Sequence, residues 1–164
     1  MAKAMPVLLA EDEEDDVFLM RRAFSVAELS NPLVTVSDGQ EAIWYLAGEG
    51  NYADRTQHPE PCLMLLDLKM PKVNGFEVLE WLQRQPRLRD NLPVIVLSSS
   101  EQEVDVRRAF ELGAHDYFVK APSFERLLEL VEKIKEGWLE AIAAGRKPEK
   151  REHGERQRQG TKTA

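Results

Sequence analysis

Five short apolar runs alternate along this chain with stretches whose apolar residues recur at helical spacing. The apolar runs are residues 7–10, 33–36, 62–67, 93–97 and 116–119. Runs that are apolar throughout suit strands covered on both faces, and their alternation with amphipathic helices indicates parallel strands joined by helical crossovers. The pattern therefore predicts an α/β fold, a doubly wound five-stranded parallel sheet with helices on both sides.

The charge distribution divides the chain into two parts. Its 164 residues favour one domain, which we expect to occupy residues 1–145. Residues 146–164 carry seven Lys or Arg and three Asp or Glu. They have almost no apolar side chains to offset the entropy of ordering, so we expect a disordered charged tail. Its basic charge could favour an acidic partner or nucleic acid, but a solvated, solubilising tail is the simpler interpretation.

The composition argues against several classes of protein. The net charge of −7 gives no reason to expect that the body of the domain binds nucleic acid. No run approaches the ~18 consecutive apolar residues of a membrane helix, and residues 1–6 are too short and weakly apolar for a secretion signal. The single cysteine, Cys62, cannot form an internal disulfide, which fits a reducing cytosol. We therefore expect a cytoplasmic protein that has no contact with a membrane.

Polar side chains stand at the ends of four of the predicted strands. Glu11 and Asp12 follow the first strand, and Asp67 ends the third. Ser98 follows the fourth strand and Lys120 follows the fifth. The carboxyl ends of parallel strands meet at one edge of a sheet, where α/β proteins bind their ligands. We therefore expect three carboxylates, a hydroxyl and an ammonium to converge at this edge.

This set of groups suits phosphoryl transfer. Clustered carboxylates repel one another unless a cation lies among them, and oxygen ligands suit Mg²⁺ or Mn²⁺. Phosphoryl transfer needs a nucleophile, a metal ion on the phosphoryl oxygens and further groups that neutralise charge. Asp67 would be the nucleophile and form an aspartyl phosphate. Lys120 would pair with one phosphoryl oxygen, and the Ser98 hydroxyl would hydrogen-bond another.

The motifs around these residues resemble those of bacterial two-component receiver domains, along about residues 5–142. The motifs are Leu9-Ala10-Glu11-Asp12, Leu65-Leu66-Asp67-Leu68-Lys69-Met70-Pro71, Asn74-Gly75, Val96-Leu97-Ser98-Ser99 and Tyr117-Phe118-Val119-Lys120. The resemblance implies a flavodoxin-like fold with strand order 2-1-3-4-5. It also implies that the metal ligands are the carboxylates of Glu11, Asp12 and Asp67 and the backbone carbonyl of Lys69, with Asp67 as the phosphoacceptor.

Three further roles follow from the same resemblance. Ser98 matches the Ser/Thr switch residue, Lys120 the invariant lysine, and Tyr117 the aromatic switch residue, although Tyr117 could also be an ordinary core residue. Receivers usually have Lys-Pro with a cis bond after the fifth strand, whereas this chain has Lys120-Ala121-Pro122. We therefore expect either a strained cis bond between Lys120 and Ala121 or a locally altered loop.

A finer resemblance points to phytochrome-associated single-domain regulators. It is carried by the loop that bears Tyr52 and Ala53, by Leu66-Asp67-Leu68-Lys69-Met70-Pro71-Lys72 and by Ile134-Lys135-Glu136-Gly137-Trp138-Leu139. That group also tolerates the missing proline after the lysine. The resemblance implies a sensor histidine kinase of the bacterial phytochrome type as the phosphoryl donor. A kinase of another sensory type is the alternative.

Three functions can be weighed for such a site. The first is a phosphorylation switch that signals by changed protein contacts and catalyses only its own phosphotransfer and dephosphorylation, because we expect no output domain after residue 145. The second is an aspartate-nucleophile phosphatase of the dehalogenase type, but that class needs a second acid two residues after the nucleophile, where this chain has Lys69. The third is a receiver that is never phosphorylated, and the complete set of site residues argues against it. We therefore favour the switch.

The last predicted helix suggests a homodimer. It covers residues 123–144, roughly 32 Å at helical rise, which is longer than one side of a five-stranded domain needs. Its apolar residues Trp138, Leu139 and Ile142 continue past the expected end of the sheet. We expect them to be exposed and to pair two copies through the fifth strand and the last helix, as the resemblance also implies. The alternative is that they fold back onto the loop of residues 48–60 in the same chain.

Overall fold

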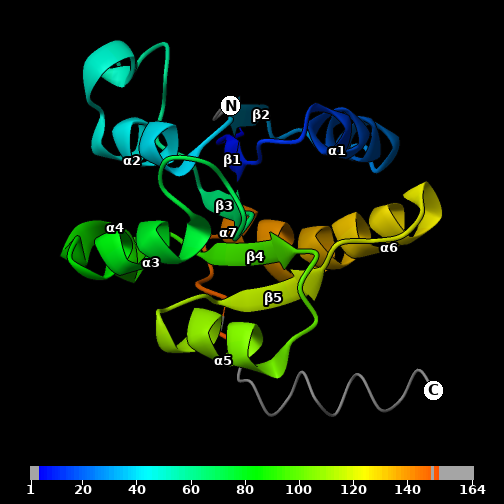
Figure 1. The fold of residues 1–164 in the computed structure, drawn as a ribbon. Coiled ribbons are helices and arrows are strands. Elements are labelled where there is room, and N and C mark those ends of the chain that lie inside the picture. Colours follow the sequence, from blue (N-terminus) through cyan, green and yellow to red (C-terminus); the bar gives the residue numbers. More distant parts are fainter. Residues whose placement is uncertain (1–3, 149, 152–164) are drawn as a thin grey trace.

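The sheet of this protein has five strands, all parallel, in the order β2-β1-β3-β4-β5 (Figure 1). The computed structural model describes residues 4–148, 150 and 151. The strands are β1 (Val7–Ala10), β2 (Leu33–Val36), β3 (Leu63–Leu66), β4 (Val94–Ser98) and β5 (Asp116–Val119). The predicted fold class and strand order are confirmed.

Helices cover both faces of the sheet (Figure 1). One face carries α2 (Gly39–Ala47), α3 (Gly75–Gln83), α4 (Pro86–Asn91) and α5 (Glu103–Glu111). The other face carries α1 (Glu14–Val26) and α6 (Phe124–Ile134), which continues through the π-helical turn η2 (Lys135–Leu139) into α7 (Glu140–Ala143). The sheet is therefore the middle of three layers.

Successive residues of the central strands supply two separate hydrophobic cores. Leu8 and Met64 face the core beneath α2, α3 and α5, whereas Leu9 and Leu65 face the core beneath α1 and α6. All four are buried. Full burial of such a side chain contributes roughly 1.5–3 kcal/mol, so a polar residue within β1 or β3 would be costly. Polar residues are accommodated only where the strands end.

The start of α3 is built against the end of β3. Asn74 and Glu77 form a capping box, in which each side chain accepts a hydrogen bond from the other residue's backbone N–H, at 2.9 and 3.1 Å. Gly75 packs against the backbone of Asp67, and a Cβ at Gly75 would lie 2.4 Å from the Asp67 carbonyl oxygen. Only glycine allows this approach, which fixes the loop that follows Asp67.

Two short elements were not predicted from the sequence. One is α4, which begins with Pro86 at a position where the missing N–H has no cost. The other is the 3₁₀ turn η1 (Gly50–Tyr52) within the long loop before β3. In that loop the Arg55 guanidinium donates to the carbonyl oxygens of Tyr45 and Leu46 at the end of α2, at 2.7 and 2.9 Å. Both elements are too short for their apolar residues to show a clear helical spacing in the sequence.

The prediction that Trp138 and Leu139 are exposed is wrong. They are 2% and 5% exposed and belong to the core beneath α1 and α6, and Ile142 is partly buried against the same core. They do not fold back onto residues 48–60 either. The helix is long because it also covers residues near the amino ends of the strands, such as Cys62. These residues therefore offer no exposed apolar surface for a homodimer.

Part of the predicted tail lies on the domain. The Arg151 backbone N–H donates to the His115 carbonyl at 2.9 Å, and the Lys150 ammonium donates to the Phe110 carbonyl at 3.2 Å. These two residues are thus placed against the domain, whereas residues 149 and 152–164 lie outside the described residues, and the disorder expected of residues 146–164 stays a prediction. Within the described ranges, no helix is both long and apolar enough to cross a membrane.

Candidate functional site

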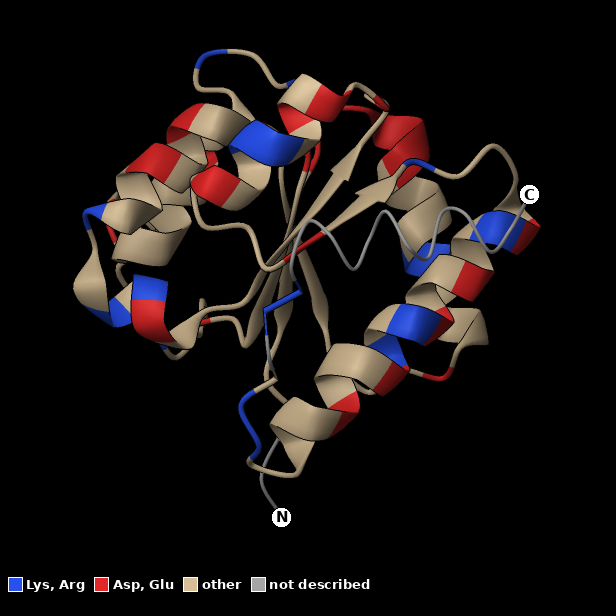
Figure 2. Ribbon diagram, turned by 90° about the horizontal axis from the view of Figure 1, so that it is seen from below, with Lys and Arg blue, Asp and Glu red and all other residues tan. Residues whose placement is uncertain are grey.

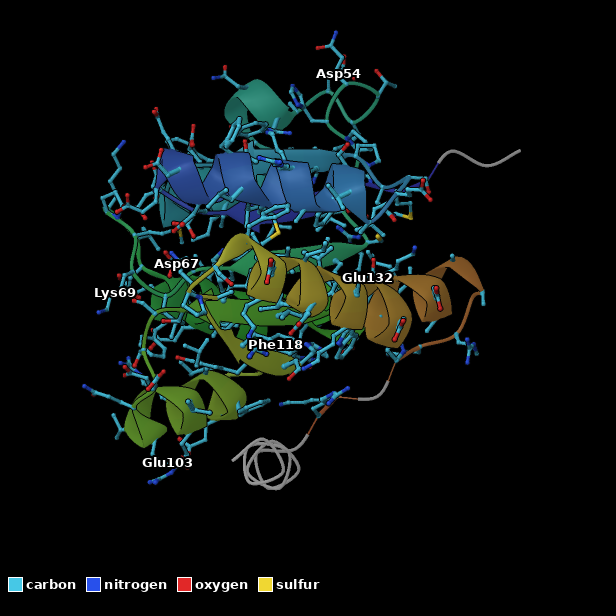
Figure 3. All side chains as sticks on the ribbon, turned by 90° about the vertical axis from the view of Figure 1, so that its right-hand side faces the viewer. Asp54, Asp67, Lys69, Glu103, Phe118 and Glu132 are labelled. Carbon is cyan, nitrogen blue, oxygen red and sulfur yellow. The ribbon has the colours of Figure 1, made fainter. Side chains whose placement is uncertain are left out.

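The candidate site lies at the carboxyl ends of the strands. Asp67 directly follows β3, and its backbone N–H donates to the Ala10 carbonyl at the end of β1 at 3.0 Å. Lys120 directly follows β5, and its N–H donates to the Ser98 carbonyl at the end of β4 at 2.8 Å. Figure 3 shows Asp67 and Lys69 together at this end of the molecule. The sheet's own hydrogen bonds therefore position both functional side chains.

Three carboxylates converge here as the sequence predicted. Glu11, Asp12 and Asp67 each offer an oxygen, and these oxygens all lie within 4.8 Å of one another. Glu11 and Asp67 are each only 4% exposed, whereas Asp12 is exposed to solvent. Hard divalent cations prefer such an all-oxygen set, partly buried and open to water on one side. These residues could therefore hold a metal ion.

Lys120 is the cation within this acidic cluster. Its Nζ lies 2.9 Å from Glu11 Oε2, 2.9 Å from Asp16 Oδ2 and 3.2 Å from Asp67 Oδ2. Burial opposes the charge of Lys120, but hydrogen bonds to Glu11 and Asp16 outweigh it and raise the pKa of Lys120 above its usual value. The lysine is therefore a permanently charged partner for the carboxylates.

The pKa of Glu11 shows that one ammonium does not balance the cluster. The pKa of Glu11 is raised to about 7: burial raises it most and the nearby Asp67 carboxylate also raises it, whereas the hydrogen bond from Lys120 lowers it. An ionised Glu11 is therefore held at a cost in free energy. The donor set fits a hard divalent cation, because additional positive charge would favour the ionised form.

Asp67 has both oxygens engaged. Oδ2 pairs with Lys120, and Oδ1 accepts a 3.3 Å hydrogen bond from the Lys69 backbone N–H. A groove of about 530 Å³ runs beside it, between the loops that follow β3 and β4. The groove is lined by Asp12, Leu68, Lys69, Met70, Pro71, Asn74, Phe76, Ser98, Ser100 and Asp105. The groove brings the predicted residues Asp12, Lys69 and Ser98 to one surface.

Ser98 and Tyr117 are joined through one residue, Ser100. The buried Ser98 Oγ accepts from the Ser100 N–H at 3.1 Å, and the Tyr117 hydroxyl donates to the Ser100 carbonyl at 2.8 Å. The Ser100 hydroxyl donates to Asp105 Oδ2 in the first turn of α5 at 2.6 Å. The Tyr117 ring is fully buried and belongs to the core. Tyr117 is thus a core residue that is hydrogen-bonded to the loop after β4.

Sequence reasoning missed Asp16 as a member of the site. Its neighbours Glu13, Glu14 and Asp15 are exposed at the start of α1, as a solvated helix start predicts. Asp16 lies in the same turn but turns back towards Lys120. The helical spacing of α1 could have shown that Asp16 faces inwards, because Asp16 precedes the buried Met20 by four residues and so lies on the same face of the helix.

The loop after Lys120 takes one of the two expected forms. No peptide bond in the described ranges is cis, so the bond between Lys120 and Ala121 is trans and the locally altered loop is the alternative found. Two residues after Ala121, the Ser123 side chain accepts from the Arg126 N–H at 3.2 Å and caps α6. Lys120 nevertheless reaches Asp67.

Comparison with known proteins identifies the family. Residues 7–132 match the family described as response regulator receiver domain. The chain belongs to this family. The receiver is 34% identical to response regulator Rcp1 of Synechocystis sp. (strain ATCC 27184 / PCC 6803 / Kazusa), over 83% of this chain and 90% of Rcp1. It is 39% identical to the probable methanogenesis regulatory protein FilR2 of Methanothrix harundinacea, over 81% of this chain and 83% of FilR2.

Solved structures of phytochrome response regulators are also similar. The phosphorylated cyanobacterial phytochrome response regulator RcpA matches with a TM-score of 0.76 and 37% identity, over 83% of this receiver and 94% of RcpA. The Mn²⁺-bound form of Rcp1 matches with a TM-score of 0.74 and 34% identity, over 83% of this receiver and 95% of Rcp1. Receiver domains bind Mg²⁺ or Mn²⁺ at an acidic pocket, and Glu11, Asp12 and Asp67 form such a pocket here.

Proposed function

We propose that this receiver accepts a phosphoryl group on Asp67 from a sensor histidine kinase in a reaction that depends on Mg²⁺ or Mn²⁺. The observation that carries the proposal is the position of Asp67. Its carboxylate lies at the end of the central strand, with the acidic residues Glu11 and Asp12 on one side and the Lys120 ammonium at 3.2 Å. A nucleophile, a metal pocket and a fixed cation are the parts that phosphoryl transfer needs.

In the transfer, an Asp67 oxygen attacks the phosphorus of a phosphohistidine. The new P–O bond forms as the P–N bond breaks, and the imidazole leaves as a neutral ring because its other nitrogen keeps a proton. Lys120 offsets the charge on one phosphoryl oxygen and the Ser98 hydroxyl donates to another. A metal ion would be held by Glu11, Asp12, Asp67 and the Lys69 backbone carbonyl, and would neutralise charge on the phosphoryl oxygens.

The output of the phosphorylated receiver is a change in its protein contacts. When the Ser98 hydroxyl turns towards a phosphoryl oxygen, it gives up its hydrogen bond from the Ser100 N–H. The Ser100 carbonyl holds the Tyr117 hydroxyl, so the rearrangement reaches the surface around α5, β5 and α6. The receiver catalyses only its own phosphotransfer and dephosphorylation, and Lys69 occupies the position where phosphatases of the dehalogenase type need an acid.

The proposed phosphoryl donor is a histidine kinase of the bacterial phytochrome type. The similarity to RcpA, a phytochrome response regulator, supports this choice. Radiolabelled phosphate should move from such a kinase to this receiver in the presence of Mg²⁺ and not in EDTA. Transfer at the same rate in EDTA would overturn the metal dependence. Faster transfer from a kinase that senses another signal would overturn the choice of donor.

A cytoplasmic location and a homodimer complete the proposal. The free thiol of the buried Cys62 supports a reducing compartment. The homodimer through β5 and α6 now rests on resemblance alone, because Trp138 and Leu139 are buried within their own chain. Sedimentation of the receiver at tens of micromolar, with and without phosphorylation, tests it. A monomer in both states would end this part of the proposal.

A further inference from the structure

Lys150 and Arg151 lie beside the start of β5. Among the described strands, β5 lies at one end of the sheet, and the backbone of an edge strand is a template for pairing with other chains unless it is covered or charged. Arg146, Lys147, Pro148, Lys150 and Arg151 are here called the basic segment. Residues 146–148 lie at a pocket beside Pro93 and His115, near the amino ends of β4 and β5. Arg151 then contacts His115 and Asp116 at the start of β5 (Figure 2). The chain therefore covers the start of β5 itself.

The basic segment is held by contacts to several elements. The Arg151 backbone N–H donates to the His115 carbonyl, just before β5, at 2.9 Å. The Lys150 ammonium donates to the Phe110 carbonyl in α5 at 3.2 Å. The Arg151 guanidinium also reaches η2, where a Cβ on Gly137 would be 4.0 Å from Nη2. Lys150 and Arg151 thus bridge α5, the start of β5 and η2.

Asp116 supplies the charge that receives the segment. It is the first residue of β5 and is 2% exposed, and its Oδ2 lies 3.3 Å from the Arg151 Nε. Its other oxygen accepts from the Tyr117 N–H at 2.9 Å. A buried carboxylate is costly unless a cation pairs with it, and Arg151 provides that cation from a segment 35 residues away in the sequence.

The overall charge of the two parts favours the same contact. The net charge of the chain is −7 and residues 146–164 carry +4, which leaves −11 on residues 1–145. A basic segment is therefore attracted to this domain over a distance of about one Debye length, ~10 Å at 0.1 M salt. The ion pair with Asp116 then selects the start of β5 from the rest of the acidic surface.

We infer that the start of β5 is a docking surface for the chain's own basic segment, anchored by Arg151 on Asp116. The docked segment occupies the His115 carbonyl and the Asp116 carboxylate at the start of this strand. A second copy of the chain, or any other protein that binds the start of β5, must displace the segment first. This inference does not rest on phosphorylation of Asp67, so its test uses the unphosphorylated chain.

Amide hydrogen exchange of the full-length chain in EDTA tests the inference. In the wild type, the Arg151 amide should exchange about tenfold more slowly than in a free peptide of residues 144–156, because it carries one backbone hydrogen bond beside one ion pair. Arg151→Gln should remove most of this protection. Arg146→Gln is the matched control and should keep it, because in the described part of the chain the Arg146 side chain forms no ion pair.

A second variant separates the anchor from a general effect of charge. Asp116→Asn keeps the shape of the side chain and should likewise remove the protection of the Arg151 amide. Its circular dichroism should match that of the wild type; if the variant unfolds, Arg151→Gln alone decides the test. Exchange of the wild-type Arg151 amide at the free-peptide rate would show that the segment does not dock. Equal loss of protection in Arg146→Gln and Arg151→Gln would show that the Arg151–Asp116 pair is not the anchor.

Discussion

The Lys120 ammonium lies 3.2 Å from Asp67 Oδ2 and 2.9 Å from Glu11 Oε2, so that one cation from the end of β5 joins the carboxylates that follow β3 and β1. The first turn of α1 adds Asp16 to the same ammonium at 2.9 Å. Residues from three separate parts of the sequence, near positions 11–16, 67 and 120, thus meet at one nitrogen atom. The stability of the metal-free protein and the chemistry of its site depend on the same contact.

Replacement of Lys120 should therefore destabilise the metal-free protein. Lys120→Met keeps the length of the side chain but leaves the buried Glu11 and Asp67 without their counter-charge. We expect the free energy of unfolding in EDTA to fall by about 1–3 kcal/mol, as measured by urea denaturation. Lys133→Met, an exposed change of the same type on α6, should change it by less than about 0.5 kcal/mol. Equal effects of the two substitutions would contradict the role given to Lys120.

Asp12→Ala should weaken the binding of Mg²⁺. Asp12 is one of the three carboxylates whose oxygens lie within 4.8 Å of one another, and its loss removes both a ligand and an attractive charge. Calorimetric titration should show an affinity at least about tenfold lower than that of the wild type. Asp15→Ala makes the same change in net charge at an exposed position of α1 and should leave the affinity nearly unchanged. Unchanged affinity in Asp12→Ala would place the ion elsewhere.

Ser98→Ala should uncouple phosphorylation from the response of the protein. The variant keeps Asp67, so it should still be phosphorylated, but it lacks the hydroxyl that links the phosphoryl group to Ser100 and Tyr117. Hydrogen exchange in α5 and β5 should change on addition of a beryllofluoride phosphoryl mimic in the wild type, and much less in Ser98→Ala. Ser99→Ala, which alters an exposed hydroxyl next to it, should respond like the wild type. A full response of Ser98→Ala would rule out the coupling.

His115 should make stability depend on pH in the acidic range. Burial, with the nearby charges of Lys150 and Lys147, lowers the pKa of His115 from 6.5 to about 4, and its Nδ1 accepts from the Val94 N–H at 3.1 Å. Between pH 6.5 and 4 the unfolded chain therefore binds a proton at His115 that the folded chain does not. The free energy of unfolding should fall by up to about 3 kcal/mol as the pH falls through this window.

His115→Asn isolates this contribution, because the asparagine oxygen can still accept from the Val94 N–H. Urea denaturation at several pH values between 7 and 4 should give a shallower slope for this variant than for the wild type. His58→Asn, which removes a histidine from the loop before β3, controls for the loss of one such residue. If His115→Asn and the wild type have the same slope, another group causes the acid sensitivity.

The site could be predicted because its residues stand at strand ends. The apolar runs fixed where the strands end, and the parallel sheet then required Asp67 and Lys120 to lie at the same edge, although they are 53 residues apart. No detail of side-chain packing was needed for that step. The capping box of Asn74 and Glu77 was not predicted, although it depends only on a spacing of three residues in the sequence.

Features that depend on packing between distant segments could not be predicted from the sequence. The period of the last helix showed that Trp138 and Leu139 are apolar, but not that the amino ends of β1 and β3 need them as cover. The partnership of Asp16 with Lys120 depends on the direction in which α1 leaves the sheet. The contact of Arg151 with Asp116 joins a segment of low hydrophobicity to the domain through charge, which a hydrophobic pattern does not reveal.

The most direct test of the central claim is the mass of the protein after incubation with acetyl phosphate and Mg²⁺. The wild type should gain the mass of one phosphoryl group, and Asp67→Asn, which keeps the size of the side chain but lacks the nucleophilic carboxylate, should gain none. Asp105→Asn, a change of the same kind at the other side of the groove, should still be phosphorylated. Equal phosphorylation of Asp67→Asn and the wild type would contradict the assignment of Asp67 as the phosphoacceptor.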